Sequence, residues 1–188
     1  FDLGYDKLYL IPVLKEILEI SPNIKIMASP WSPPSWMKTN NSTIGGKLLP
    51  EFYDAYALYF VKYIQSMKDE GIKIDAITIQ NEPLHDGNNP SMYMSSTEQA
   101  LFVKQSLGPT FLQNQIDTKI IIYDHNADRI DYPISVLNDL SARQYIDGSA
   151  FHLYGGNISD LSVLKSAHPD KDLYFTEQWV GAPGDLFG

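Results

Sequence analysis

Two glutamates that close short apolar segments are the residues of this chain best suited to acid–base chemistry. Glu82 ends the segment 77–82, and Glu177 ends the segment 173–177. Both segments predict buried parallel strands, so each carboxyl group falls at the carboxyl end of a strand. In a β/α barrel, that end carries the active site. Two carboxyl groups that meet over a polar cleft can cleave a glycosidic bond, one as proton donor and the other as nucleophile.

The residues around Glu82 favour a catalytic role. A single glutamate at a strand end could equally serve a structural ion pair or a loop cap, but a second glutamate occupies the same kind of place. Asn81 puts an amide beside Glu82, and Pro83 ends the strand. The Asn81 amide could bind a sugar 2-hydroxyl, a contact that strengthens in the transition state.

The elements that would position these glutamates alternate along the chain. Amphipathic segments of helical spacing separate the apolar segments, and this alternation predicts parallel strands joined by helical crossovers. The predicted strands are residues 24–28, 75–80, 119–123, 149–153 and 172–176.

An open α/β sheet and a closed barrel both satisfy this alternation. No glycine-rich nucleotide loop follows a predicted strand, and polar residues follow four strand ends instead of one switch point, which favours the barrel. We therefore expect residues 1–188 to be part of one catalytic (β/α)8 TIM-barrel domain, covering roughly strands 3 to 7. A complete barrel needs eight units, so about two are expected before Phe1 and about one after Gly188.

Several local signals predict where helices begin and end. Apolar positions at helical spacing predict a helix over residues 52–68, with Gly71 as its stop, and Pro12 fits the first turn of an opening helix.

Ser96 with Gln99 resembles a capping box that opens the next helix, which we expect to end near Gly108 and Pro109. Residues 29–50 and 82–95 are the longest predicted loops. Both follow strands, so both should lie on the catalytic face.

Composition excludes several classes of function. A net charge of −9 and a pI near 4.7 argue against nucleic acid as a partner. The chain has no cysteine, so a disulfide framework or a thiolate metal site is excluded. No His-x-x-x-His pair occurs, and we expect neither metal nor cofactor. No apolar segment reaches the roughly 20 residues of a membrane span, so we expect no stable membrane insertion.

Four motifs in a fixed order make the chain recognisable. Ala-Ser-Pro-Trp-Ser-Pro-Pro-Ser-Trp-Met-Lys-Thr-Asn occupies residues 28–40, and Thr-Ile-Gln-Asn-Glu-Pro occupies residues 78–83. Phe-His-Leu-Tyr at 151–154 and Phe-Thr-Glu at 175–177 follow. This set resembles glycoside hydrolase family 30, the glucosylceramidase-like retaining enzymes of clan A. The resemblance runs across nearly the whole chain, and its first motif is long and specific.

The resemblance implies a barrel whose fourth strand carries the acid/base and whose seventh carries the nucleophile. Carried residue by residue, Glu82 matches the acid/base and Glu177 the nucleophile. Trp31 matches a tryptophan that lines the subsite of the cleaved sugar. The family usually adds an arginine and an aspartate from early strands and a side β-sandwich, all of which lie outside this chain.

The same resemblance assigns the remaining polar residues of the expected site. His152 and Tyr154 match a pair on the sixth strand, with the tyrosine hydroxyl near the nucleophile, and Asp124 matches an acidic residue at the end of the fifth. Trp179 either shields the nucleophile or packs behind it, and Trp31 and Trp36 either stack on sugar or form the core of their own loop. The expected substrate-binding residues are Trp31, Asn81, Asp124, His152, Tyr154 and Trp179.

The stretches 83–93 and 124–126 resemble the bacterial β-glucanase branch of the family more than its ceramide-cleaving branch. This favours an endo-β-1,6-glucanase that acts on a β-glucan or β-glucoside and is secreted, periplasmic or bound to the cell surface. Two alternatives stay open: a glucosylceramidase that acts on a glycolipid, and a carbohydrate-binding barrel that has lost catalysis.

Overall fold

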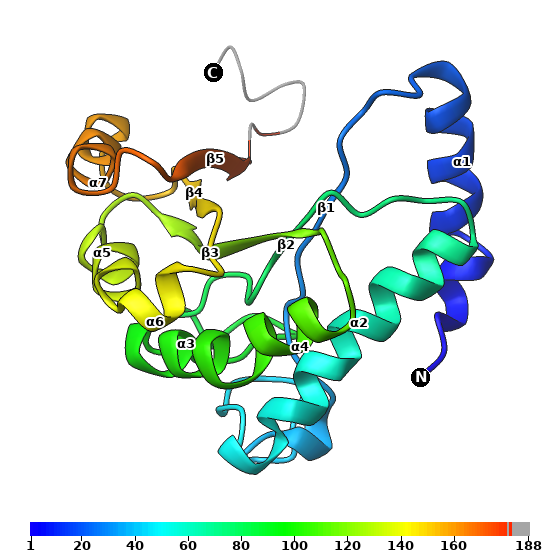
Figure 1. Ribbon diagram of the computed structural model, residues 1–188, viewed down its shortest axis with the longest axis horizontal. Helices are drawn as coiled ribbons and strands as arrows, with labels where there is room; N and C mark the ends of the chain where they lie inside the picture. The colour runs from blue at the N-terminus through cyan, green and yellow to red at the C-terminus, as the bar shows by residue number, and fades with distance from the viewer. Residues whose placement is uncertain (180, 182–188) are drawn as a thin grey trace.

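A single curved sheet of five parallel strands forms the centre of the molecule (Figure 1). The computed structural model describes residues 1–179 and 181. The strands follow one another across the sheet in chain order, as the predicted barrel portion requires. They are β1 (Met27–Ala28), β2 (Ala76–Thr78), β3 (Lys119–Asn126), β4 (Gly148–His152) and β5 (Asp172–Glu177).

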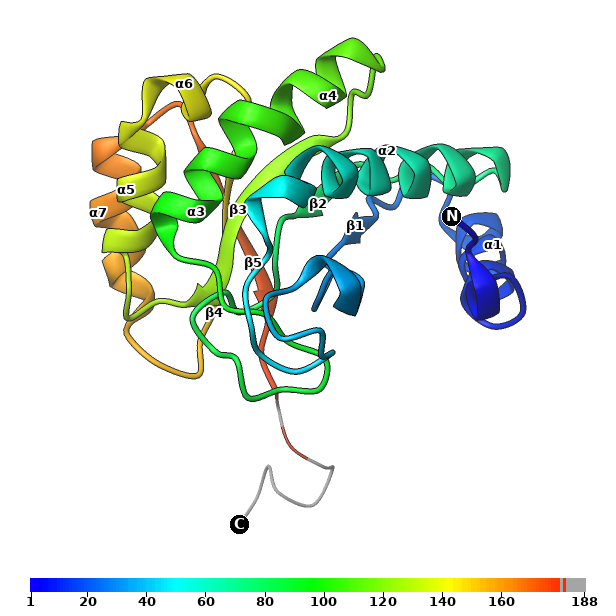
Figure 2. The same ribbon diagram turned by 90° about the horizontal axis from the view of Figure 1, so that it is seen from below.

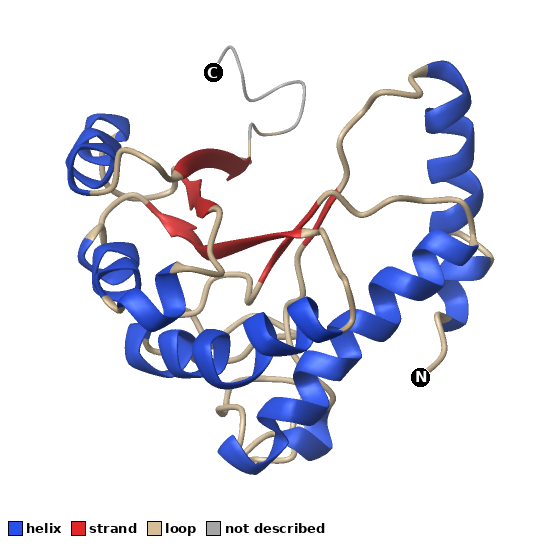
Figure 3. Cartoon of the chain, in the orientation of Figure 1, coloured by secondary structure: helices blue, strands red, loops and turns tan. Residues whose placement is uncertain are grey.

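The helices lie outside the arc of the sheet, and within the described part of the chain none covers the concave face (Figure 3). This one-sided cover is typical of a barrel wall and differs from an open sheet with helices on both faces. The helices are α1 (Leu10–Ile20), α2 (Tyr53–Asp69), α3 (Ser96–Phe102), α4 (Gly108–Gln113), α5 (Asp131–Asn138), α6 (Leu140–Arg143) and α7 (Leu161–Ala167).

The structure confirms some helix signals and corrects others. Gly71 follows α2 with φ +83°, the left-handed stop that the sequence predicts, and Pro12 lies in the first turn of α1. The capping box lies one residue earlier than predicted, because Ser95 accepts from the Glu98 N–H while Glu98 accepts from the Ser95 N–H. Gln99 therefore has no capping role.

The helix that begins at Ser96 does not end near Gly108 and Pro109, as the sequence suggested. A π-helical segment, Val103–Leu107, joins α3 to α4, and the helical path continues to Gln113. Proline lacks the N–H that an α-helix needs, and the wider π turn before it accommodates this loss.

The concave face changes from apolar to polar along the strands. Ala76, Ile121 and Ala150 form a small apolar cluster there, with Met27 and Tyr174 packed against it. Side chains two residues further along a strand point to the same face. Apart from β3, those positions are polar, namely Ser29, Thr78, His152 and Thr176. The carboxyl end of the sheet therefore presents a polar layer to the interior.

The loops after β1 and β2 lie side by side at the carboxyl end of the sheet (Figure 2). Ser91 donates its backbone N–H to Thr43, and Tyr93 donates its own to Gly46, each over 2.9 Å. The buried Lys38 ammonium donates to the Ser91 carbonyl over 2.6 Å. These bonds join the two predicted catalytic-face loops into one wall.

No helix among the residues that the structure describes is long and apolar enough to cross a membrane. A cavity of about 440 Å³ is lined mainly by apolar side chains of α1, α2 and the first two strands. No carboxylate is among its described lining residues.

Candidate active site

A bulge near the end of β3 turns Asp124 into the interior. Ile120 and Ile122 face the helices and Ile121 faces the concave side, so regular alternation would point Tyr123 inward. Instead, Tyr123 and Asp124 have φ of +72° and +63°, and the register with β4 shifts there. Tyr123 packs in the helix-facing core, which leaves Asp124 on the concave side.

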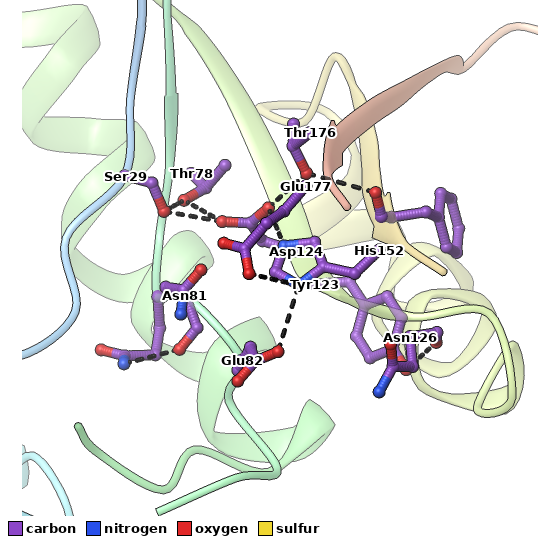
Figure 4. Close-up of polar contacts among 12 residues, drawn as sticks. Ser29, Thr78, Asn81, Glu82, Tyr123, Asp124, Asn126, His152, Thr176 and Glu177 are labelled. Carbon is purple, nitrogen blue, oxygen red and sulfur yellow. Dashed lines mark hydrogen bonds and ion pairs between the residues drawn. The ribbon is translucent and has the colours of Figure 1, made fainter. Parts of the chain in front are cut away.

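The Asp124 carboxylate is buried and fully engaged (Figure 4). Its Oδ1 accepts from His152 Nε2 over 3.1 Å and from the Thr176 hydroxyl over 2.7 Å. Its Oδ2 accepts from the hydroxyls of Ser29 and Thr78 over 2.6 and 2.8 Å. Burial alone would raise the pKa of Asp124, but these hydrogen bonds outweigh it and lower the pKa below its usual range, so the group is an anion.

His152 lies between carboxylates on both sides of its ring. Nε2 faces Asp124, while Nδ1 lies 3.2 Å from Glu82 Oε1 and 4.0 Å from Glu177 Oε1. Burial lowers the pKa of His152, but the hydrogen bonds to Asp124 and Glu82 raise it to about 9. The ring is therefore an imidazolium at neutral pH, with both nitrogens donating.

The positive charge on His152 bears on metal binding. Glu82, His152 and Glu177 offer ligand atoms within 4.8 Å of one another, a spacing that a metal ion could bridge. An imidazolium has no free nitrogen lone pair, so His152 cannot ligate a metal until it loses a proton.

Glu82 is fixed through both its backbone and its side chain. Its φ is +45°, and its N–H donates to the Asp124 carbonyl over 2.9 Å. His152 lies next to Oε1, and Asn88 Nδ2 donates to Oε2 over 3.1 Å. The hydrogen bond with His152 lowers the pKa of Glu82 even though partial burial opposes this.

Glu177 approaches the same point from the last residue of β5. The Tyr154 hydroxyl donates to its Oε1 over 3.1 Å. Its side chain is 36% exposed, against 12% for Glu82. Oxygens of the two carboxylates lie within 4.8 Å of each other. This is close to the roughly 5–5.5 Å separation in retaining glycosidases and below the roughly 6.5–9.5 Å of inverting ones.

A cavity of about 160 Å³ lies beside Glu177. Four of the predicted substrate-binding residues line it, namely Trp31, Asn81, Asp124 and His152. Ser29, Thr78 and Thr176 complete the polar lining.

The structure gives the other predicted residues different surroundings. Asp124 and His152 line the cavity, and both are buried with their polar atoms hydrogen-bonded within the protein. Trp179 is 68% exposed and does not line the cavity. Trp36 is also exposed and packs edge-on against Phe52, with the ring centroids 5.2 Å apart.

Sequence reasoning missed several polar residues that the fold brings to the site. Thr78 and Thr176 are polar residues inside apolar strand segments just before the carboxyl end, which was a usable signal. Ser29 stands in the first family motif without a predicted role. Asn88 lies in a loop six residues after Glu82, and nothing in the local pattern indicates that its amide turns back to that carboxylate.

Comparisons with known proteins agree with this geometry. The sequence model of the glycosyl hydrolase family 30 TIM-barrel domain matches residues 2–184. An endo-1,6-beta-D-glucanase of Neurospora crassa is 38% identical over 189 residues, covering 97% of this chain and 39% of that protein. The mouse lysosomal acid glucosylceramidase is 30% identical over 188 residues, covering 92% of this chain and 36% of its own length.

Among solved structures, the endo-β1,6-glucanase BT3312 superimposes with a TM-score of 0.94 at 45% identity. The match covers 97% of this chain and 44% of that one. The chain thus spans less than half the length of each of these three proteins.

Proposed function

Because the chain belongs to glycosyl hydrolase family 30, we propose that it carries the catalytic face of a retaining glycoside hydrolase that cleaves β-1,6-linked glucan. The observation that carries this proposal is the pair Glu82 and Glu177, with carboxylate oxygens within 4.8 Å beside a polar cavity. We also propose that the chain is part of one catalytic barrel domain.

In the first step, Glu177 attacks the anomeric carbon as the glycosidic C–O bond breaks. Glu82 donates a proton to the departing oxygen, and a covalent glucosyl ester forms on Glu177. In the second step, Glu82 takes a proton from water, whose oxygen attacks the same carbon and releases Glu177. Two inversions leave the product with the β configuration of the substrate.

The charge arrangement suits the second step and sets a condition on the first. His152 stabilises the Glu82 carboxylate, the form needed to accept a proton from water. Proton donation needs the neutral acid, and the lowered pKa of Glu82 confines that form to acidic pH. The proposed enzyme is therefore most active in acid.

Substrate contacts are proposed for the residues that border the open side of the site. Trp31 offers an apolar face at the cavity for the sugar ring, and the neighbouring Asn81 amide is placed to bind its 2-hydroxyl. Tyr154 orients Glu177 through its hydroxyl, and the exposed Trp179 is available to outer sugar units.

The β-1,6 linkage is proposed from similarity to proteins with that activity, in N. crassa and in the solved structure BT3312. A polymeric glucan cannot cross a membrane, so we propose that the protein acts outside the cytoplasm. The likeness to the mouse glucosylceramidase supports a second candidate, hydrolysis of a glycolipid with a β-linked glucose.

The complete protein incubated with β-1,6-, β-1,3- and β-1,4-glucans and with glucosylceramide tests these candidates. We expect oligosaccharides from the β-1,6-glucan alone, with the β anomer appearing first in a proton NMR time course. Glucose released from the lipid would favour the second candidate. An α anomer as first product would refute the retaining mechanism, and binding without hydrolysis would indicate a carbohydrate-binding barrel without catalysis.

A further inference from the structure

One fully buried polar side chain behind the sheet has no part in the mechanism described so far. Gln99 lies on α3, facing the sheet, and a buried amide is destabilising unless its hydrogen bonds are made. Ser95 and Glu98 already cap this helix, so capping does not account for Gln99.

Gln99 makes its hydrogen bond to the bulge of β3. Its Oε1 accepts from the backbone N–H of Tyr123 over 3.1 Å, and its Nε2 lies 3.9 Å from the Met94 sulfur. β2 pairs with β3 only as far as Ile121, so at Tyr123 this side chain supplies the acceptor that a longer neighbouring strand would provide.

The bulge needs such support because its backbone is strained. Tyr123 and Asp124 are both left-handed, and a non-glycine residue keeps that conformation only where its surroundings hold it there. A large aromatic residue such as Tyr123 is especially rare in this conformation. A regular strand would turn Tyr123 into the cavity and Asp124 into the apolar core.

We propose that Gln99 is a positioning residue for Glu82: by holding the bulge, it places the Asp124 carbonyl on the Glu82 N–H and the Asp124 carboxylate on His152. This inference rests on the proposed function, in which Glu82 is the acid and base. Gln99 itself touches no part of the site. Its effect reaches Glu82 through two hydrogen bonds of Asp124. The Asp124 carbonyl accepts from the Glu82 N–H over 2.9 Å, and the Asp124 carboxylate accepts over 3.1 Å from His152, the cation next to the Glu82 side chain.

The test is Gln99→Met in the complete protein, since methionine has a similar volume and replaces the carbonyl oxygen that accepts from the Tyr123 N–H with a weakly accepting thioether sulfur. A displaced acid should matter most when the leaving group needs protonation. We expect kcat/KM on the glucan to fall about 10- to 100-fold, as for a misplaced catalytic group, and to fall less than about threefold on a dinitrophenyl β-glucoside.

The matched control is Thr118→Val, just before the amino end of β3 and therefore at the opposite end of that strand from the bulge. The buried Thr118 hydroxyl also bonds one backbone group, the Ile74 carbonyl at 2.9 Å. Its loss should lower the melting temperature and leave the ratio of the two kcat/KM values unchanged. Gln99→Glu keeps an oxygen at the same reach and should restore most of the ratio lost in Gln99→Met.

If Gln99→Met does not fold, Gln99→Asn replaces it, because its amide is one methylene too short to reach Tyr123. Equal loss on both substrates, or no loss, would overturn the positioning role while the wild-type activity stands. A wild-type protein that cleaves neither substrate would overturn the proposed function and this inference with it.

Discussion

Glu82 and Glu177 bring their carboxylate oxygens within 4.8 Å of each other, but the contacts that hold the two side chains differ greatly in number. Glu82 is held by its backbone N–H, by His152 and by Asn88, and its side chain is 12% exposed. Among the described residues, Glu177 receives one side-chain hydrogen bond, from Tyr154, and its side chain is 36% exposed.

The difference follows from position in the sheet. Glu82 follows β2, which has a paired strand on each side, and the loop after it folds back over the site. Glu177 ends β5, which among the described strands pairs only with β4. The acid/base candidate is therefore set by contacts within this chain, whereas the nucleophile candidate has fewer of them.

The largest expected effects separate the two glutamates by role. Glu177→Gln should reduce turnover on the order of 10⁵-fold on every substrate, because no covalent intermediate can form. Glu82→Gln should reduce kcat/KM about 10²- to 10⁴-fold on glucan, and far less on a dinitrophenyl β-glucoside, whose leaving group needs no protonation in the first step. Steady-state rates on the two substrates measure this, and the reverse pattern would exchange the two assignments.

The next largest effect is expected from removing His152, the cation that lies between Glu82 and Glu177. His152→Gln leaves Asp124 buried without its countercharge and should lower the free energy of unfolding by about 3–5 kcal/mol. It also removes the cause of the lowered pKa of Glu82, so the alkaline limb of kcat/KM should move to higher pH. His168→Gln, which changes a buried histidine near α7, should leave the pH profile in place.

The same histidine predicts how stability depends on pH. Its pKa is about 9 in the folded state and roughly 6.5 when unfolded, so its contribution is complete below pH 6.5 and is lost as pH rises through 9. Urea titrations between pH 6 and 10 should show this loss in the wild type and not in His152→Gln. If the free energy of unfolding changed with pH equally in the two proteins, His152 would not be ionised in the folded state.

A smaller effect on kcat is expected from removing the Tyr154 hydroxyl, which donates to Glu177. Tyr154→Phe removes the one hydrogen bond that Glu177 receives among the described residues, which should reduce kcat about tenfold. Tyr174→Phe, near the amino end of β5, is the control and should leave kcat unchanged, because its hydroxyl bonds Asp172. An unchanged kcat in Tyr154→Phe would mean that elements outside this chain orient Glu177.

The smallest effect tests the redundancy around Glu82. Asn88→Ala removes one of its two side-chain donors and should reduce kcat/KM about fivefold or less. Because a donor stabilises the carboxylate, its loss should move the alkaline limb to higher pH, and Asn88→Asp should move it further by adding a negative charge. Asn114→Ala, which breaks a local helix-end bond, is the control.

Local sequence patterns were enough to predict the five strands, the helix after residue 52 and the two glutamates. All five predicted strands exist, and the helix after residue 52 and its glycine stop are where local spacing placed them. Glu82 and Glu177 meet because parallel strands bring their carboxyl ends to one edge, a rule that needs only strand order. Local propensity and periodicity were sufficient for these features.

The hydrogen-bond partners of the side chains at that edge depend on long-range contacts in the folded chain. Periodicity would send Tyr123 into the interior, and the bulge sends Asp124 there instead, since Gln99 on a distant helix accepts the Tyr123 N–H. Asp124 and His152 are therefore buried and hydrogen-bonded to each other beside the cavity, an arrangement that the sequence did not predict. Such outcomes depend on which distant groups satisfy a strained backbone, and no local pattern of residues encodes that pairing.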